Sequence, residues 1–216
     1  YRLGHGQLLD SIIPDGLWDP YNDMHMGMCG ELCAEKEGIP RSAQDEYAVQ
    51  SYEAAQKAVA GGAFNDEIVP LDGIVLDEEP GRAKLDKIGK LRAAFKKDGT
   101  ITAASSSSIN DGAAALVLMR ESTAKKLGLT VLARIVGHAT NAQEPNLFTT
   151  APVGAVQKLF KKTGWTASDV DLFEINEAFA VVPMAAMHDL EIPHDKVNIH
   201  GGACALGHPI GASGAR

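Results

Sequence analysis

The chain has 216 residues, of which 45% are hydrophobic and 22% are charged, so its composition is that of a globular protein with a sizeable core. Its formal net charge of −8 argues against a broad nucleic-acid-binding surface, and no apolar run approaches the roughly 20 residues that span a bilayer. Three cysteines, few and odd in number, do not suit the disulfide framework of a secreted protein, so a cytoplasmic location is expected.

Residues 1–100 are predicted to consist mostly of helices and loops. A helix is expected to begin near Ser42, which forms a capping box with Asp45, and to end at Gly61–Gly62. Between these points, apolar residues recur at helical spacing. Residues 65–100 carry short apolar stretches that are interrupted by turn sequences, which predicts a loop-rich region with small strands.

From about residue 101 onward, the pattern predicts strands that alternate with helices, and therefore an α/β layered domain. The run Ala113–Met119 is short, uninterrupted and bounded by turn signals, as expected for a strand buried on both faces. Pro152 and Gly164 mark the start and end of one helix. The expected strands are 100–104, 113–119, 131–138, 172–175 and 197–200, and the expected helices are 121–127, 152–163 and 177–190.

Two segments combine polar side chains with the ends of predicted strands. They are Phe173–Ala180 and Asn198–Gly214, and strand ends in open α/β sheets are where ligand-binding side chains converge. His208 in the second segment is a candidate general base, although a histidine in such a loop could also simply cap a neighbouring carbonyl. A phosphate-binding loop is the weaker interpretation, because the glycines follow neither of the phosphate-loop patterns.

Five segments resemble, in the same order, the motifs of thiolases, and in particular those of bacterial acetyl-CoA acetyltransferases. They are His25-Met26-Gly27; Phe95; Thr102–Ser107 with Asn110-Asp111-Gly112; Asn176-Glu177-Ala178-Phe179; and Gly201–Arg216. The resemblance extends over essentially the whole chain. It implies an α/β fold, namely part of a layered αβαβα core with a helix- and loop-rich CoA-binding loop domain. Residues 1–100 would form the loop domain, 101–128 the end of the N-terminal core domain, and 129–216 a truncated C-terminal core domain.

The resemblance also implies an activity. Thiolases condense two acetyl-CoA molecules to acetoacetyl-CoA in a reversible Claisen reaction, or cleave a 3-ketoacyl-CoA by thiolysis, through a covalent acyl-cysteine. His208 would take the proton of the cysteine thiol, and Asn176 would hold a water that stabilises the oxyanion together with His208. Coenzyme A is then a substrate or product, and no other cofactor and no metal is expected. The full-length protein would be a homodimer or homotetramer, without nucleic-acid or membrane partners.

Six further site residues follow from the resemblance, all of them implied to bind the acyl-CoA: His25, Met26, Phe95, Ser107, Phe148 and Phe179. His25 and Ser107 would line the pantetheine arm, and Phe95 and Phe179 would form apolar walls of the same tunnel. Phe148 stands where many thiolases have a methionine near the acyl pocket, so its bulk is expected to restrict acyl chain length.

The two catalytic cysteines of the family are expected outside these 216 residues, one before and one after, so the chain resembles an internal fragment. Alone it is expected to be inactive and poorly soluble, because a strand missing from a sheet leaves unpaired backbone groups. Cys29 and Cys33 are predicted to share one helix face in a packing role rather than to bind zinc, and Cys204 is predicted to lie in the core. The alternative function is a non-catalytic CoA-thioester-binding module, or one half of a split thiolase.

Overall fold

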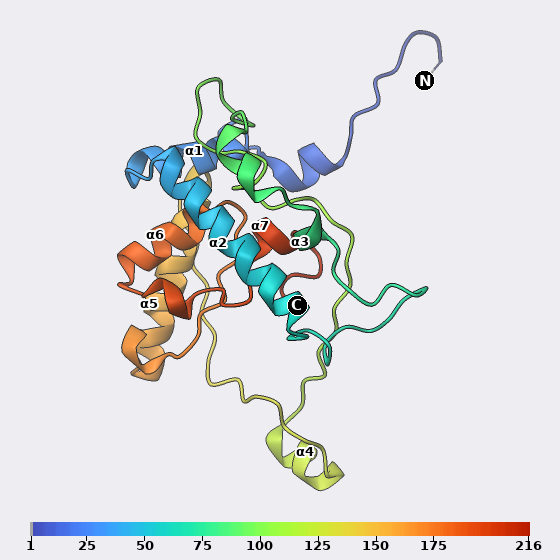
Figure 1. The fold of residues 1–216 in the computed structure, drawn as a ribbon, viewed down its shortest axis with the longest axis vertical. Helices are drawn as coiled ribbons and strands as arrows, with labels where there is room; N and C mark the ends of the chain where they lie inside the picture. Colours follow the sequence, from blue (N-terminus) through green and yellow to red (C-terminus); the bar gives the residue numbers. More distant parts are fainter. Residues whose placement is uncertain (1) are drawn as a thin grey trace.

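The computed structural model describes residues 2–216, which form helices joined by long loops (Figure 1). The α-helices are α1 Met26–Lys36, α2 Arg41–Ala60, α3 Glu79–Arg82, α4 Glu121–Leu127, α5 Ala151–Thr163, α6 Val181–Asp189 and α7 Ala203–Leu206. Shorter helical turns are η1 Ile13–Leu17, η2 Leu85–Lys90, η3 Pro145–Thr150, η4 Ala167–Asp169 and η5 His194–Lys196. Within residues 2–216, no helix is both long and apolar enough to cross a membrane.

Regular sheet structure is limited to one small antiparallel ladder. Strand β1 (Trp18–Asp19) pairs with β2 (Met24–His25), in the register Trp18 opposite His25. Elsewhere in the described chain, single bridges join Phe173 to Val197 in parallel and Ser106 to Phe179 in antiparallel orientation. These isolated bridges matter because they align the two segments that carry the predicted site.

Helix α2 confirms the prediction for the first part of the chain, except for its cap. The helix runs to Ala60 and stops at Gly61, as expected. The predicted capping box of Ser42 with Asp45 is wrong, because the helix begins at Arg41 and its N-cap, Pro40, offers no side-chain hydrogen bond. The Asp45 carboxylate instead accepts hydrogen bonds from Arg41 Nε at 2.8 Å, one turn away on the same helix face.

Helices α4 and α5 confirm the predictions that rest on local stop signals. Each ends at a glycine in the left-handed conformation, Gly128 with φ 64° and Gly164 with φ 77°. A residue without a Cβ reaches this conformation at little cost, so glycine terminates the helix regardless of tertiary context. Pro152 lies in the first turn of α5, where its missing N–H costs nothing.

The predicted strands at 113–119 and 131–138 are wrong: both segments run outside any sheet, in the long loop that carries α4 away from the body of the molecule (Figure 1). Val117 in the first segment is 85% exposed, and Leu132 in the second is 94% exposed. An apolar run shows that a segment suits a buried strand, but a strand also needs a neighbour for its backbone hydrogen bonds. Within residues 2–216, no segment pairs with either one in a ladder or bridge.

The predicted strand at 100–104 is also wrong, because hydroxyl groups replace the ladder. Thr102 N–H donates to Ser105 Oγ at 2.9 Å, and Ser106 Oγ donates to Thr102 O at 2.8 Å, which closes a turn. In place of the strands expected at 172–175 and 197–200, the structure has one parallel bridge between Phe173 and Val197. The small strands expected within 65–100 are reduced to one Leu71–Ile74 bridge, accompanied by α3 and η2.

The helix expected over 177–190 begins only at Val181. The four preceding residues belong to a different hydrogen-bond pattern: Ala180 N–H donates to Ser105 O at 2.9 Å, and Ser107 N–H donates to Ala178 O at 3.1 Å. Backbone groups that are already paired with residues 105–107 cannot also form a helical turn. Residues 178–180 are thereby held next to 105–107.

The core forms around α6, which packs against α1 and α5. Its Val181 and Ala185 are fully buried, and the surrounding cluster includes Cys33 from α1 and Val153 from α5. A second, smaller cluster joins Tyr47 of α2 to Cys204 of α7. The predicted packing role of the cysteines is confirmed, since Cys29, Cys33 and Cys204 are free thiols with 0%, 2% and 1% exposure.

Candidate active site

An aromatic row brings together three of the predicted CoA-binding residues. His25 stacks on Phe95, with ring centroids 5.0 Å apart, and Phe95 meets Phe179 edge-on at 5.7 Å. Both arrangements are favourable geometries for aromatic pairs. The approach of Phe95 requires a glycine at position 27, because a Cβ there would overlap the phenyl ring.

His25 is oriented by the start of helix α1. As the N-cap residue, it accepts a hydrogen bond from Gly27 N–H on Nδ1 at 2.9 Å, so in the neutral ring the proton is on Nε2. Burial lowers the pKa of His25, which favours this neutral form. Met26 is the first residue of α1 and is partly buried beside this cap.

Phe148, the fourth predicted aromatic residue, is not part of the aromatic row, but it packs against the core cluster around α6. It belongs to η3, which packs against α1 and α6, and it is partly buried against the cluster that also contacts Phe95 and includes Phe179. The structure therefore gathers all four of the predicted aromatic residues around one side of α1.

His208 has the geometry of a general base. His208 Nδ1 lies 2.7 Å from Ser213 Oγ, and this hydroxyl also lies 3.2 Å from Pro209 O. In the tautomer in which Nδ1–H donates to Ser213 Oγ, Nε2 is free to accept a proton, and it lies 3.5 Å from Asn176 Nδ2. Burial lowers the pKa of His208, which keeps the imidazole neutral near pH 7. The structure thus brings the two predicted catalytic residues together.

Backbone hydrogen bonds hold both catalytic segments against residues 105–108. His208 N–H donates to Ser108 O at 3.0 Å, while Ser107 N–H donates to Ala178 O at 3.1 Å. The Ser107 hydroxyl points to the same carbonyl at 3.4 Å. Ser107, a predicted CoA-binding residue, is therefore placed between the Asn176 and His208 segments rather than in the aromatic row.

Glu177 is a fully buried charged residue that the sequence reasoning did not single out. It follows Asn176 directly and is 0% exposed, yet its carboxylate faces four donors. Tyr47 OH at 2.9 Å and Asn198 Nδ2 at 2.8 Å donate to Oε1, and Ser51 Oγ at 2.8 Å and Cys204 N–H at 3.0 Å donate to Oε2. A signal was present, because Tyr47 and Ser51 are polar groups spaced four residues apart along α2, on one face.

The three cysteines of the chain are poorly suited to nucleophilic attack. Burial raises the pKa of Cys29 and of Cys33, and burial together with the Glu177 charge raises the pKa of Cys204 well above its usual range. A raised pKa keeps the sulfur as a thiol, which is a weak nucleophile. The same causes raise the pKa of Tyr47, which therefore stays a hydrogen-bond donor to Glu177.

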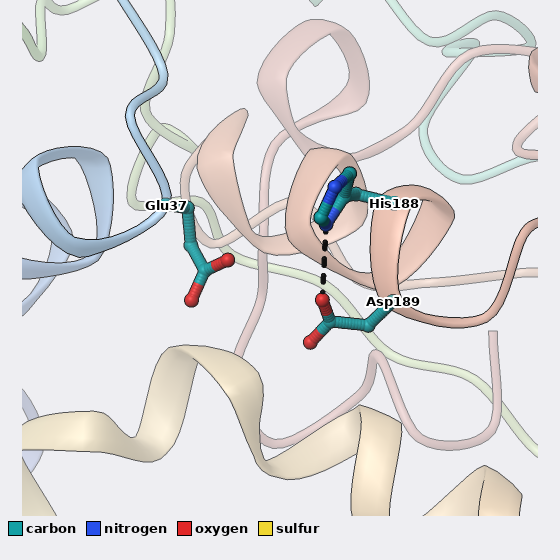
Figure 2. Close-up of side chains that lie close together, drawn as sticks. All are labelled: Glu37, His188 and Asp189. Atoms are coloured by element: carbon teal, nitrogen blue, oxygen red, sulfur yellow. Dashed lines mark hydrogen bonds and ion pairs between the residues drawn. The ribbon is translucent and has the colours of Figure 1, made fainter.

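One surface cluster has the side-chain types of a metal site. Glu37, His188 and Asp189 place one ligand atom each within 4.8 Å of one another, at the C-terminal ends of α1 and α6 (Figure 2). His188 Nδ1 lies 3.1 Å from Asp189 Oδ1, and the His188 side chain is 83% exposed. A structural zinc site has four ligands, so we interpret this cluster as a surface ion pair.

A hollow of about 480 Å³ opens next to the Glu177 network, lined in part by Tyr47, His194 and Asn198. The His194 ring stacks on Tyr47 with centroids 5.1 Å apart. Neither Asn176 nor His208 contributes to its lining, so it is separate from the candidate active site.

Comparison with known proteins identifies the family. Residues 1–122 match the family model described as "Thiolase, N-terminal domain", and residues 129–216 match "Thiolase, C-terminal domain". Among curated relatives, "Acetyl-CoA acetyltransferase 2" of Arabidopsis thaliana is 51% identical over 100% of this chain and 56% of its own length. "Acetyl-CoA acetyltransferase" of Pseudomonas aeruginosa is 46% identical over 100% of this chain and 57% of its own. The chain thus spans little more than half the length of these relatives.

Solved structures agree with the sequence comparison. The Acat5 thiolase from Ascaris suum in complex with coenzyme A superposes with a TM-score of 0.92 at 38% identity, over 99% of this chain and 57% of that one. The Bacillus anthracis acetyl-CoA acetyltransferase superposes with a TM-score of 0.91 at 40% identity, over 100% and 57%. The predicted fold class, a partial thiolase-like α/β fold, is confirmed. This chain belongs to the thiolase family.

Proposed function

We propose that the full-length polypeptide containing these residues is an acetyl-CoA C-acetyltransferase. It condenses two acetyl-CoA molecules to acetoacetyl-CoA and catalyses the reverse thiolysis. The observation that carries the proposal is the arrangement of His208, whose Nδ1 lies 2.7 Å from Ser213 Oγ and whose Nε2 lies 3.5 Å from Asn176 Nδ2. The names of the relatives support the same activity.

The nucleophile of this reaction is a cysteine from outside residues 1–216, because the three thiols present are buried and have raised pKa values. His208 Nε2 takes the proton of that thiol, and the thiolate attacks the carbonyl carbon of the acyl-CoA. The thioester bond to CoA breaks, the CoA sulfur leaves with the proton that His208 took from the cysteine, and the acyl group remains on the cysteine. A second base then removes a proton from the methyl carbon of another acetyl-CoA, and the resulting carbanion attacks the carbonyl carbon of the acyl-cysteine. The new carbon–carbon bond forms as the thioester bond to the cysteine breaks, and the cysteine sulfur leaves and takes back a proton from the second base.

The remaining residues bind the substrate in this proposal. Asn176 holds a water that, together with His208, donates hydrogen bonds to the developing oxyanion. His25, Met26 and Ser107 line the pantetheine arm. The aromatic row supplies apolar walls, which its stacked and edge-on contacts keep rigid. Phe148 limits the length of the acyl chain, and its packing on the same core cluster supports this role.

We further propose that the full-length protein is a homodimer or homotetramer that works in the cytoplasm, in fatty acid metabolism. The free state of the three cysteines suits a reducing compartment. Acyl-CoA and CoA are its small-molecule partners, as in the coenzyme A complex of the Ascaris relative.

Thiolysis of acetoacetyl-CoA by the full-length protein tests the proposal, measured as loss of substrate in the presence of CoA. The His208→Gln variant removes the base and is expected to lower kcat by roughly 10²- to 10⁴-fold. His138→Gln, a change of the same type at a residue outside the site, is the control and is expected to keep full activity. A full-length protein that binds CoA thioesters without cleaving them would refute the enzymatic proposal and favour the binding module.

A further inference from the structure

We propose that Glu177 is a positioning residue, whose buried carboxylate ties the Asn176 segment to the His208 segment and so sets the distance between the two reactive side chains. This inference rests on the proposed function of that pair. Glu177 touches neither reacting side chain through its carboxylate; its partners are Tyr47, Asn198, Ser51 and Cys204.

Both oxygens of Glu177 are surrounded by hydrogen-bonding groups inside the core. Each oxygen faces two of them, three from side chains and one from the backbone. Asn198 Nδ2 and Cys204 N–H can only donate, one to each oxygen, so both oxygens act as acceptors. A fully buried carboxylate is costly unless such donors surround it, so a full set of donors indicates a built site.

The partners of Glu177 come from each element that must be aligned. Tyr47 and Ser51 project from α2, and Cys204 N–H is in α7, four residues before His208. The peptide of Glu177 is bonded directly to Asn176, and its carbonyl oxygen also lies 3.8 Å from Cys204 Sγ. Glu177 is therefore joined to Asn176 through the peptide bond that precedes it and to the start of α7 through its carboxyl group.

Asn198 and Gly202 reinforce this link. Asn198 bonds both backbone groups of Ile175, through Oδ1 and Nδ2 at 2.8 Å each, while Nδ2 also reaches Glu177. Gly202 permits the close approach of the α7 segment, because a Cβ at this position would overlap the Glu177 carboxyl group. Gly202 N–H is itself held by Ser51 Oγ at 3.0 Å.

An amide cannot replace this carboxylate. In Glu177→Gln, one oxygen becomes an NH₂ group that faces Asn198 Nδ2 or Cys204 N–H, neither of which can accept. At least one hydrogen bond is therefore lost, and the link between α7 and the Asn176 segment is weakened. Displacement of a catalytic group by about 1 Å costs roughly 100-fold in rate. We expect the effect in kcat rather than in KM, because none of the predicted CoA-binding residues contacts the Glu177 carboxylate.

The test is steady-state thiolysis of acetoacetyl-CoA by the full-length protein. The rate is divided by the number of active sites that can be acylated, so that unfolded protein does not lower the measured kcat. Glu177→Gln is expected to lower kcat per site by roughly 10- to 100-fold with KM within about threefold, and Glu177→Asp, which keeps the charge, to restore part of the loss. Glu53→Gln is the matched control: it removes a carboxylate from an exposed position on α2, the helix that carries Tyr47 and Ser51, and is expected to leave kcat unchanged. An unchanged kcat per site in Glu177→Gln, with only stability or the number of sites reduced, would overturn the inference.

A second measurement does not depend on activity. In structures of the full-length protein, Glu177→Gln is expected to lengthen the distance of 3.5 Å between Asn176 Nδ2 and His208 Nε2, whereas Glu53→Gln is not. An unchanged distance would overturn the inference. If Glu177→Gln does not fold, Ser51→Ala and Tyr47→Phe each remove one donor and are expected to lower kcat per site by a smaller factor; full activity per site in both would overturn it. A wild-type protein without thiolysis would instead refute the proposed function.

Discussion

Removal of the Tyr47 hydroxyl tests the energetics of the buried network around Glu177. Tyr47 is 4% exposed, and its hydroxyl donates to Glu177 Oε1 at 2.9 Å. A hydrogen bond to a charged group contributes about 1.5 to 3 kcal/mol. In Tyr47→Phe the ring still fills its place in the core while the carboxylate keeps three of its four donors, so we expect a destabilisation in this range.

The loss is expected to be local, and hydrogen exchange measures it at the affected backbone. Cys204 N–H donates to the same carboxylate at 3.0 Å, so the segment around 199–206 should open more readily in Tyr47→Phe. Because each 1.4 kcal/mol is a factor of ten, exchange in this segment should be about ten- to a hundredfold faster. Mass spectrometry of the full-length protein resolves peptides from this region.

Tyr52→Phe is the matched control for this measurement. Tyr52 lies on the same helix and loses the same atom, but it is not part of the Glu177 network. The Tyr52 hydroxyl makes no hydrogen bond within residues 2–216, so its removal is expected to cost less than the loss of the hydroxyl that donates to Glu177. Equal exchange rates around Cys204 in the Tyr47→Phe and Tyr52→Phe variants would refute the reasoning, because the hydroxyl of Tyr47 would then contribute nothing to the network.

Three further predictions concern the site and its packing. Because burial lowers the pKa of His208, the pH at which kcat/KM falls by half on the acid side should lie below 6.5, the usual pKa of a histidine. The stability that comes from keeping His208 neutral is complete above pH 6.5 and is lost as the pH falls through the lowered pKa. A half-maximal pH above 6.5 would contradict this prediction. Phe148→Ala should raise kcat/KM for six-carbon relative to four-carbon 3-ketoacyl-CoA by about tenfold or more, and an unchanged ratio would show that Phe148 does not limit acyl length. Gly202→Ala should lower the free energy of unfolding by about 1 to 3 kcal/mol, because the new methyl group would overlap Glu177. Gly214→Ala is the control, because a methyl group there faces open space. Equal melting temperatures of the two variants would argue against the close approach of Gly202 to Glu177.

Sequence reasoning succeeded where a local rule was sufficient. Helices α4 and α5 end at Gly128 and Gly164 because a left-handed residue terminates a helix by itself. Helix α2 was predicted correctly from its periodicity and its terminal glycines, whereas the predicted capping box of Ser42 with Asp45 was wrong. Hydrogen bonds within a helix join residues four apart, so the information needed to predict them lies within the segment.

The predicted strands failed for the opposite reason. The segment 113–119 has the composition of a buried strand, but Leu116 is 64% exposed and the segment has no ladder partner within residues 2–216. The backbone of a strand is satisfied by another segment, which composition does not name. Residues 176–180 show the same limit, since their pairing with 105–107 replaced the first turn of the predicted helix.

For the candidate site, the motifs in the sequence pointed to Asn176, His208 and the aromatic residues, and a family resemblance supplied their expected roles. Only the tertiary structure showed which groups contact the two ring nitrogens of His208, namely Ser213 Oγ at Nδ1 and Asn176 Nδ2 at Nε2. Only the tertiary structure revealed Glu177 as the centre of a network, because Tyr47 and Ser51 lie 130 and 126 residues away in the chain. The sequence determined which side chains are available; the folded chain decided which of them meet, since a buried charge is stable only where donors from distant segments converge on it.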